Sequence, residues 1–202
     1  MTSAADFDVS RETLERLRAY QALVEKWNPT INLISKGDVG EIWQRHILDS
    51  LQIPALKLEY SHWVDIGSGG GFPGLVIAIC ALENAPEATH TLIESDLRKS
   101  TFLRTVIREL GLNAKVLQER IENVRPLEAD VVSARALASL DLLCEFSARH
   151  LGPEGKAVFL KGRTVDQEIE QAKNAWTFEL RKVPSKTDPE AAIVILEGIE
   201  RV

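Results

Sequence analysis

Residues 65–74 read Asp-Ile-Gly-Ser-Gly-Gly-Gly-Phe-Pro-Gly, the most informative segment of this sequence. Its first two residues end an apolar segment at 63–66, and its last residue leads into a second apolar run at 75–79. A glycine-rich turn between a strand and a helix is typical of a nucleotide-binding loop, because glycine lets the backbone turn sharply and approach a ligand closely. Pro73 suits the first turn of the helix that follows. An ordinary turn seldom needs three consecutive glycines, so we predict a ligand-binding loop.

Outward from this loop, apolar strand-like segments alternate with helical ones. The predicted strands are residues 63–66, 91–94, 115–117, 130–133 and 156–160. Apolar residues at helical spacing separate them, and Gly111 is placed to cap the end of one helix. This alternation indicates a parallel sheet that is covered on both faces.

The end of the chain differs from this pattern. After a helix at about 165–174 come two strands, 177–183 and 191–197. The polar linker between them, residues 184–190, is too short for a crossover helix, so the two strands should run antiparallel. The sequence therefore predicts an α/β fold with a Rossmann-like, seven-stranded sheet of the methyltransferase type, mostly parallel with an antiparallel C-terminal hairpin.

Two helices precede the first strand. The first begins after the capping residue Ser10 and is expected to end at Asn28-Pro29. The second runs from about residue 39 to 51 and is stopped by Pro54. We expect one domain over residues 1–202, in which about 1–58 form an N-terminal helical cap and about 59–202 the Rossmann-like core.

The composition places the chain among soluble globular proteins. Hydrophobic residues make up 45% and charged residues 27%, and no apolar run approaches the roughly 18 to 20 residues that cross a bilayer. The first nine residues carry Asp6 and Asp8 and no basic residue, which argues against a signal peptide. We therefore expect a cytoplasmic protein without a membrane partner.

Cysteine and histidine usage predicts no metal site. Cys80 and Cys144 are the only cysteines, and each lies in an apolar, helical segment where a small buried side chain is expected. A structural zinc site needs about four clustered ligands, whereas the four histidines are scattered along the chain.

Two acidic residues bear on which ligand the loop takes. Gly69, Gly71 and Gly74 satisfy the dinucleotide pattern G-x-G-x-x-G, which is a weak signal alone. Asp65 stands where methyltransferases place an acid facing the cationic methionine end of S-adenosylmethionine, a position that is usually apolar in dinucleotide enzymes. Glu94, at the end of the second strand, is placed to accept hydrogen bonds from ribose hydroxyls in either class. S-adenosylmethionine is the predicted cofactor, with an NAD-dependent oxidoreductase as the alternative.

Basic residues follow the strand ends although the net charge is −6. That net charge speaks against a protein that coats nucleic acid through bulk electrostatics. Ligands of an open parallel sheet bind outside the carboxyl ends of its strands, so this edge would attract a polyanion. The basic residues are Arg98, Lys99, Arg120, Arg135, Lys161 and Arg163, with Arg45 and His46 on the second N-terminal helix. On that helix Arg45 and Asp49 have the spacing of an ion pair.

Several motifs resemble one family over the whole chain. They are Trp27-Asn28 with Asn32-Leu33, Arg45-His46-x-x-Asp49-Ser50-Leu51, the loop ending Gly-Phe-Pro-Gly, Glu94-Ser95 with Lys99 and Phe102-Leu103, Ser133-Ala134-Arg135-Ala136, and Lys161-Gly162. In these the sequence resembles the bacterial small-subunit ribosomal RNA guanine-N7 methyltransferases (RsmG, formerly glucose-inhibited division protein B). Ser35 and Arg98 depart from the commonest residues of that family without changing the chemistry.

The resemblance implies a site and a substrate. Gly67, Ser68, Gly69 and Phe72 would surround the cofactor, Glu94 would lie at its ribose, and Ile121 and Glu122 would flank the adenine. Arg45, His46, Lys99 and Lys161 would face the RNA, which is 16S ribosomal RNA of the small subunit.

The implied reaction needs no general base, because N7 of guanine carries a lone pair and no proton. Residues 133–136 lack the Asn-Pro-Pro-Tyr type motif of amino-group methyltransferases. We expect Arg135 to be the catalytic residue that bridges cofactor and substrate, by positioning and electrostatics. A methyltransferase-like RNA-binding module without catalysis is a further alternative.

Overall fold

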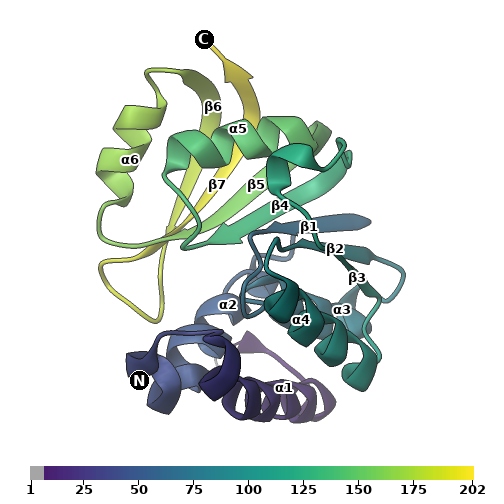
Figure 1. Cartoon of the computed structure of the whole chain (residues 1–202). Coiled ribbons are helices and arrows are strands. Elements are labelled where there is room, and N and C mark those ends of the chain that lie inside the picture. Colours follow the sequence, from purple (N-terminus) through teal and green to yellow (C-terminus); the bar gives the residue numbers. More distant parts are fainter. Residues whose placement is uncertain (1–6) are drawn as a thin grey trace.

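The computed structural model describes residues 7–202, and Figure 1 shows one sheet with helices on both faces. Residues 1–6 lie outside the described part. They include Asp6, one of the two acidic residues used above to argue against a signal peptide. The strands are β1 (His62–Ile66), β2 (Thr89–Ile93), β3 (Ala114–Leu117), β4 (Ala129–Arg135), β5 (Leu151–Lys161), β6 (Trp176–Pro184) and β7 (Ala192–Arg201). None of the helices in this range is long and apolar enough to span a membrane.

The strand order is β3-β2-β1-β4-β5-β7-β6. Strands β1 to β5 pair in parallel, whereas β7 lies between β5 and β6 and runs antiparallel to both. The structure thus confirms the mostly parallel sheet with an antiparallel C-terminal hairpin. Because the order reverses beside β1, the carboxyl ends of β1 and β4 border a crevice of the kind that holds ligands in open sheets.

Each face of the sheet has its own apolar core. On one face pack α1 (Arg11–Ile31), α3 (Gly74–Asn84) and α4 (Leu97–Leu110), with Leu17, Leu75 and Phe102 in one buried cluster. On the other lie α5 (Leu140–His150) and α6 (Val165–Ala172), against Val64 and Ile66 of β1. Side chains alternate between the faces of a strand, so Asp65 points to the α3 face.

The predicted end of the first helix is wrong. Ser10 does cap α1, since its Oγ accepts a hydrogen bond from the Thr13 amide at 3.1 Å. The helix then continues through Pro29 to Ile31 and ends at Asn32, whose backbone is left-handed (φ 48°). Asn28 stabilises this ending, because its Oδ1 accepts from the Ile34 amide at 2.9 Å. Pro29 removes one backbone donor from the helix, and Ile31, two residues beyond it, is buried.

The second helical segment is not a single α-helix. It consists of a 3-10 helix η2 (Lys36–Glu41), a π-helix η3 (Trp43–Leu48) and one turn of α-helix, α2 (Asp49–Leu51). A further 3-10 turn, η4 (Pro54–Leu56), begins at the proline that was expected to stop it. A π-helical turn often marks a functional site, and this one presents two predicted site residues.

The predicted Arg45–Asp49 ion pair does not form. Arg45, whose side chain is 59% exposed, pairs with Asp38 and lies 3.9 Å from Glu41. Asp49 is 16% exposed and turns inward to Arg135. Sequence spacing allowed the local pair, but the two side chains point to different surroundings. By contrast, the C-cap at Gly111 and the burial of Cys80 and Cys144 are confirmed.

Candidate active site

The glycine loop lies at the carboxyl end of β1 and leads into α3. Gly67, Gly69 and Gly71 have φ of 64°, 55° and 92°, in the left-handed region that favours glycine. A Cβ on Gly67 would also lie 2.4 Å from Leu137 Cδ1. Ser68 fastens the loop, since its amide donates to the Ile93 carbonyl at 3.0 Å and its hydroxyl to the Asp65 carbonyl at 2.9 Å. The loop is therefore held by its own hydrogen bonds, and two of its turns, at Gly67 and Gly71, leave no space for a side chain.

A cavity of about 590 Å³ opens over this loop, and we call it the loop cavity. All the predicted cofactor residues but one line it: Gly67, Ser68, Gly69, Phe72, Glu94, Ile121, Glu122 and Arg135. Apolar walls come from Ile93, Leu142 and Phe146. The structure thus brings together residues from four strand ends around one hollow.

Glu94 connects the loop to the start of α4. Its side chain is largely buried, and Oε2 accepts from the Gly69 amide at 2.8 Å while Oε1 accepts from the Asp96 amide at 2.8 Å. A carboxylate has about four acceptor positions, so two remain for a ligand in the loop cavity. The carboxylate is thus held in place, which suits a group that receives a pair of hydroxyls.

Asp65 is the predicted cofactor residue that does not line the cavity. It is 1% exposed beneath the loop, where Oδ1 accepts from the Ser133 hydroxyl at 2.7 Å. Its Oδ2 lies against the first turn of α3, so close that a Cβ on Gly74 would be 2.6 Å away. Burial raises the pKa of Asp65 to about 6, and the bond from Ser133 opposes this in part. Asp65 supports the loop from below, and its action on the cofactor stays a prediction.

Arg135, at the end of β4, lies at the centre of a charged cluster. Its Nη2 donates to His46 Nδ1 at 2.6 Å and its Nη1 to the Arg45 carbonyl at 3.1 Å. The guanidinium lies over the Phe72 ring, 5.2 Å from the centroid, and Phe72 also contacts the His46 ring. Arg135 therefore ties the N-terminal helical segment to the glycine loop.

The contact with Arg135 determines the protonation of His46. A guanidinium only donates hydrogen bonds, so Nδ1 of His46 is the acceptor and the ring proton resides on Nε2. Burial, with the charge of Arg135, lowers the pKa of His46 to about 4. His46 is hence neutral at pH 7, and at 8% exposure it is a packed residue more than a surface one.

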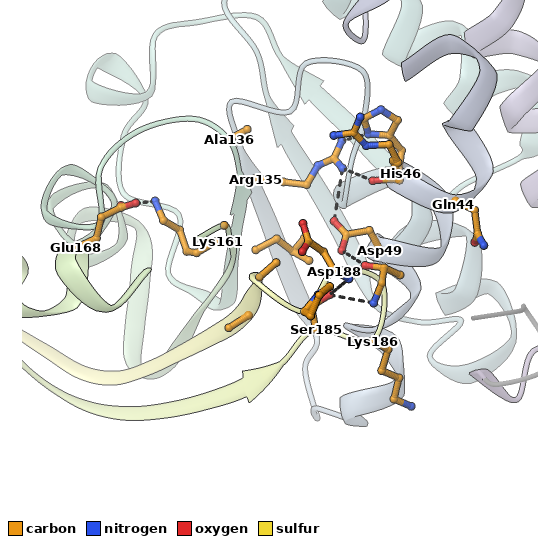
Figure 2. Close-up of a pocket in the computed structure, with 17 residues that line it drawn as sticks. Gln44, His46, Asp49, Arg135, Ala136, Lys161, Glu168, Ser185, Lys186 and Asp188 are labelled. Atoms are coloured by element: carbon orange, nitrogen blue, oxygen red, sulfur yellow. Dashed lines mark hydrogen bonds and ion pairs between the residues drawn. The ribbon is translucent and has the colours of Figure 1, made fainter. Parts of the chain in front are cut away.

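A second cavity, of about 1000 Å³, lies beside the first, and we call it the hairpin cavity. It is bounded by the N-terminal helical segment, the end of β5 and the β6–β7 loop, as Figure 2 shows. Arg135 and Ala136 line both cavities, so the two hollows meet at the end of β4. Two adjoining cavities suit an enzyme that transfers a group from one bound ligand to another.

The residues predicted to face RNA divide between the two cavities. Lys99 lines the loop cavity, whereas Arg45, His46 and Lys161 line the hairpin cavity. Lys161 is 10% exposed, pairs with Glu168 at 2.5 Å and donates to the Ala138 carbonyl at 3.0 Å. It is thus engaged within the protein, while Arg98, Arg120 and Arg163 are exposed.

Sequence reasoning missed a polar network beneath the hairpin cavity. Thr187 donates from Oγ1 to Asp49 Oδ1 at 2.8 Å, and Gln52 Nε2 donates to the same oxygen at 3.0 Å. Gln52 Oε1 also accepts from the Lys186 amide at 2.7 Å. The polar composition of the linker 184–190 could have indicated that this segment makes hydrogen bonds. Nothing in the sequence identifies its partners, which lie 130 or more residues away in the chain.

This combination of fold and site defines a methyltransferase dependent on S-adenosylmethionine. The lining of the loop cavity fits that cofactor, because it combines a carboxylate held in place, a glycine-rich backbone turn and apolar walls. Residues 13–194 match the sequence model of the family described as rRNA small subunit methyltransferase G, and the chain belongs to this family. The alternatives, an oxidoreductase and a non-catalytic module, find no support.

Relatives of the same name match almost the whole chain. A protein of Ruegeria sp. (strain TM1040) is 48% identical over 197 residues, covering 98% of this chain and 96% of the relative. One from Cereibacter sphaeroides (strain ATCC 17029) is 50% identical over 199 residues, covering 98% and 97%.

Solved structures of distant sequence share the fold. A SAM-dependent methyltransferase from Aquifex aeolicus superposes with a TM-score of 0.60 at 14% identity, covering 80% of this chain and 94% of the other. A methyltransferase from Geobacter sulfurreducens superposes with a TM-score of 0.59 at 12% identity, covering 96% of this chain and 92% of the other.

Within residues 7–202, no three His, Cys, Asp or Glu side chains are grouped to hold a metal ion.

Proposed function

We propose that this protein methylates N7 of one guanine in 16S ribosomal RNA of the small ribosomal subunit. The observation that carries the proposal is the position of Arg135, which lines the loop cavity and the hairpin cavity at once. Two ligands held in these hollows would meet at its guanidinium. The relatives named rRNA small subunit methyltransferase G support ribosomal RNA as the substrate.

The loop cavity holds the cofactor in this proposal. Glu94 accepts hydrogen bonds from the ribose hydroxyls, Ile121 and Glu122 flank the adenine, and the methionine part follows the backbone of Gly67, Ser68 and Gly69. Phe72 and Arg135 close the side toward the hairpin cavity. Asp65 contributes its charge through the loop without contact, because it is buried beneath the backbone.

The chain's task in the reaction is to position two ligands and to balance charge. S-adenosylmethionine supplies, when bound, a methyl group on a positively charged sulfur. Guanine N7 presents an in-plane lone pair and no proton, so no side chain has to accept a proton. The neutral, buried His46 agrees with this, since its role in the structure is to orient Arg135.

The RNA is expected to approach along the basic edge. Lys99 and the exposed Arg120 line the loop cavity, and Arg98, next to Lys99 in the chain, is exposed. Arg45 lies at the mouth of the hairpin cavity with 59% of its side chain exposed. These charges suit contacts with phosphates, which fix orientation without reading sequence.

We also propose that the chain is one domain, with residues 1–58 as a cap on a core at 59–202, and that it acts in the cytoplasm. Leu17 and Tyr20 of α1 share a buried cluster with Leu75 and Phe102 of the core, which supports a single folding unit. The Tyr20 hydroxyl also donates to the Gly70 carbonyl at 2.5 Å, so the cap contacts the loop directly.

The test is transfer of a radiolabelled methyl group from S-adenosylmethionine to small ribosomal subunits from cells that lack this gene. Chemical cleavage specific for N7-methylguanine then maps the product. We expect one labelled guanine in 16S RNA. Label at another atom, or none in subunits or free 16S RNA, would refute the proposal while leaving the fold and family unchanged.

A further inference from the structure

We propose that the hairpin cavity receives the target guanine and that Asp49 reads its identity, by accepting a hydrogen bond from the N1–H of the base. The inference rests on the proposed function and names the residue that decides which base is methylated. It uses the one acidic residue of the Arg45–Leu51 motif, which the cofactor site leaves without a role.

The two oxygens of Asp49 have different surroundings. Oδ1 is held by Thr187 Oγ1 at 2.8 Å and by Gln52 Nε2 at 3.0 Å. Oδ2 faces Arg135, with Nη1 at 3.6 Å, which is longer than a hydrogen bond. Figure 2 shows the carboxylate between Arg135 and the loop that carries Ser185. The protein thus holds Oδ1 by two hydrogen bonds and Oδ2 only by this longer ion pair with Arg135, so Oδ2 keeps the capacity to accept a hydrogen bond from a ligand in the cavity.

Asp49 is also the carboxylate of the hairpin cavity that pairs with Arg135, the residue that lines both cavities. Three carboxylates line the hairpin cavity: Asp49, Glu168 and Asp188. Glu168 is paired with Lys161, and Asp188 accepts from the Glu190 amide at 2.9 Å within the exposed β6–β7 loop. Only Asp49, among these three, lies against Arg135.

The Arg135–Asp49 pair matches one edge of guanine. In guanine, N7, O6 and N1–H follow one another around the rim of the base. If N7 points to the loop cavity, O6 comes beside Arg135, which only donates, and N1–H comes beside Asp49, which only accepts when ionised. Adenine presents an amine and a bare N1 at these positions. Its amine would face the donor Arg135 and its N1 would face the acceptor Asp49, so neither hydrogen bond could form.

Charge supports the same placement. Methylation at N7 leaves the base with a positive charge, because N7 contributes its lone pair and has no proton to lose. A buried carboxylate beside the base stabilises that charge far better than one in water. The side chain of Asp49 is 16% exposed, and Arg135, against which it lies, lines both cavities.

The experiment compares two bases at the mapped position. Small subunits are reconstituted with 16S RNA that carries guanine or 2-aminopurine there. The analogue keeps N7 and the 2-amine, has a bare N1 and lacks O6. In single-turnover transfer we expect the wild type to prefer guanine by at least about 100-fold. In Asp49→Asn, whose amide can donate to a bare N1, the guanine rate falls about 30-fold and the preference falls at least about tenfold.

Thr187→Val is the matched control. It removes one of the two donors to Oδ1 and keeps both the carboxylate and the hydrogen bond from Gln52, so the carboxylate stays in place and the preference should remain unchanged. If Asp49→Asn does not fold, as shown by the loss of cooperative unfolding, Asp49→Glu replaces it. The added methylene moves the carboxylate oxygens and should also reduce the preference for guanine. Binding of S-adenosylhomocysteine should stay within about twofold in every variant, because Asp49 does not line the loop cavity.

The outcomes separate this inference from the function on which it rests. Equal rate losses at guanine and 2-aminopurine in the Asp49 variants would overturn the base-reading role and assign Asp49 to structure alone. A wild-type protein that methylates no guanine would instead overturn the proposed function.

Discussion

The guanidinium of Arg135 donates a hydrogen bond across 2.6 Å to Nδ1 of His46, and so joins the end of β4 to the helical segment that precedes the sheet. Residues 89 positions apart in the chain thereby form the boundary between the two cavities. The hydrogen bond is made by a guanidinium that is buried, and this burial lowers the pKa of Arg135. A neutral His46 is the acceptor that such a charge requires.

Arg135→Ala should abolish most of the methyl transfer. The variant loses the positive charge between the cavities and the bond to His46, so we expect kcat/KM to fall by about 100-fold or more. Methyl transfer at limiting RNA and cofactor measures this, with Arg181→Ala, an exposed arginine on β6, as control. Full activity of Arg135→Ala would show that the catalytic assignment is wrong.

Glu94→Ala should weaken cofactor binding. It removes the carboxylate from the loop cavity and leaves the Gly69 and Asp96 amides without their acceptor. We expect the Kd for S-adenosylhomocysteine, measured by calorimetry, to rise by about 10- to 100-fold. Glu119→Ala is the matched control, because Glu119 lines the same cavity and is exposed. Equal affinities of the two variants would contradict the ribose assignment, and binding of NAD by the wild type would contradict the cofactor class.

Asp65→Asn should change how stability depends on pH. The pKa of Asp65 is raised from 3.8 unfolded to about 6 folded, so the folded state binds more protons between these values. The stability contributed by this group is therefore lost as pH rises from about 4 to 6, by up to about 3 kcal/mol.

The Asn variant does not titrate, so its stability relative to wild type should improve from pH 4 to pH 7. Urea unfolding at the two pH values measures this, and Asp166→Asn, an exposed residue of α6, serves as control. A relative stability that stays constant with pH would mean that Asp65 is ionised at its ordinary pKa.

Lys99→Ala should weaken RNA binding in a salt-dependent way. Losing one phosphate contact reduces the slope of log K against log salt by about 0.7 to 0.9. Filter binding of 16S RNA over a range of salt concentrations tests this. Lys115→Ala, near the amino end of β3, should leave the slope unchanged. An unchanged slope for Lys99→Ala would remove Lys99 from the RNA interface.

Gly74→Ala should destabilise the fold. The new Cβ would lie 2.6 Å from Asp65 Oδ2 and 2.7 Å from its Cβ, so the buried carboxylate or the helix has to shift. We expect a loss of about 1 to 3 kcal/mol in the free energy of unfolding. Gly40→Ala, with no atom within 4 Å of its Cβ, should be close to neutral. Similar effects of the two substitutions would show that the backbone around Gly74 relaxes freely.

The sheet, the glycine loop and the ligand class could be predicted from the amino-acid sequence. Strands buried on both faces appear in the sequence as continuous apolar runs. The turns at Gly67, Gly69 and Gly71 need a left-handed backbone, which the sequence shows as glycine. The strand ends then placed Glu94 and Arg135 at one edge, since parallel strands share a direction. Local pattern and sheet geometry suffice for that part.

Which of these residues contact one another could not be predicted from the sequence and is seen in the folded chain. It turned Asp49 away from Arg45 and toward Arg135 and Thr187, placed Asp65 beneath the loop, and paired Lys161 with Glu168. It also carried α1 past Pro29, because Asn28 bonds the chain beyond the helix. The physical reason is that side-chain partners and burial depend on residues distant in sequence, where spacing along one helix or strand carries no information.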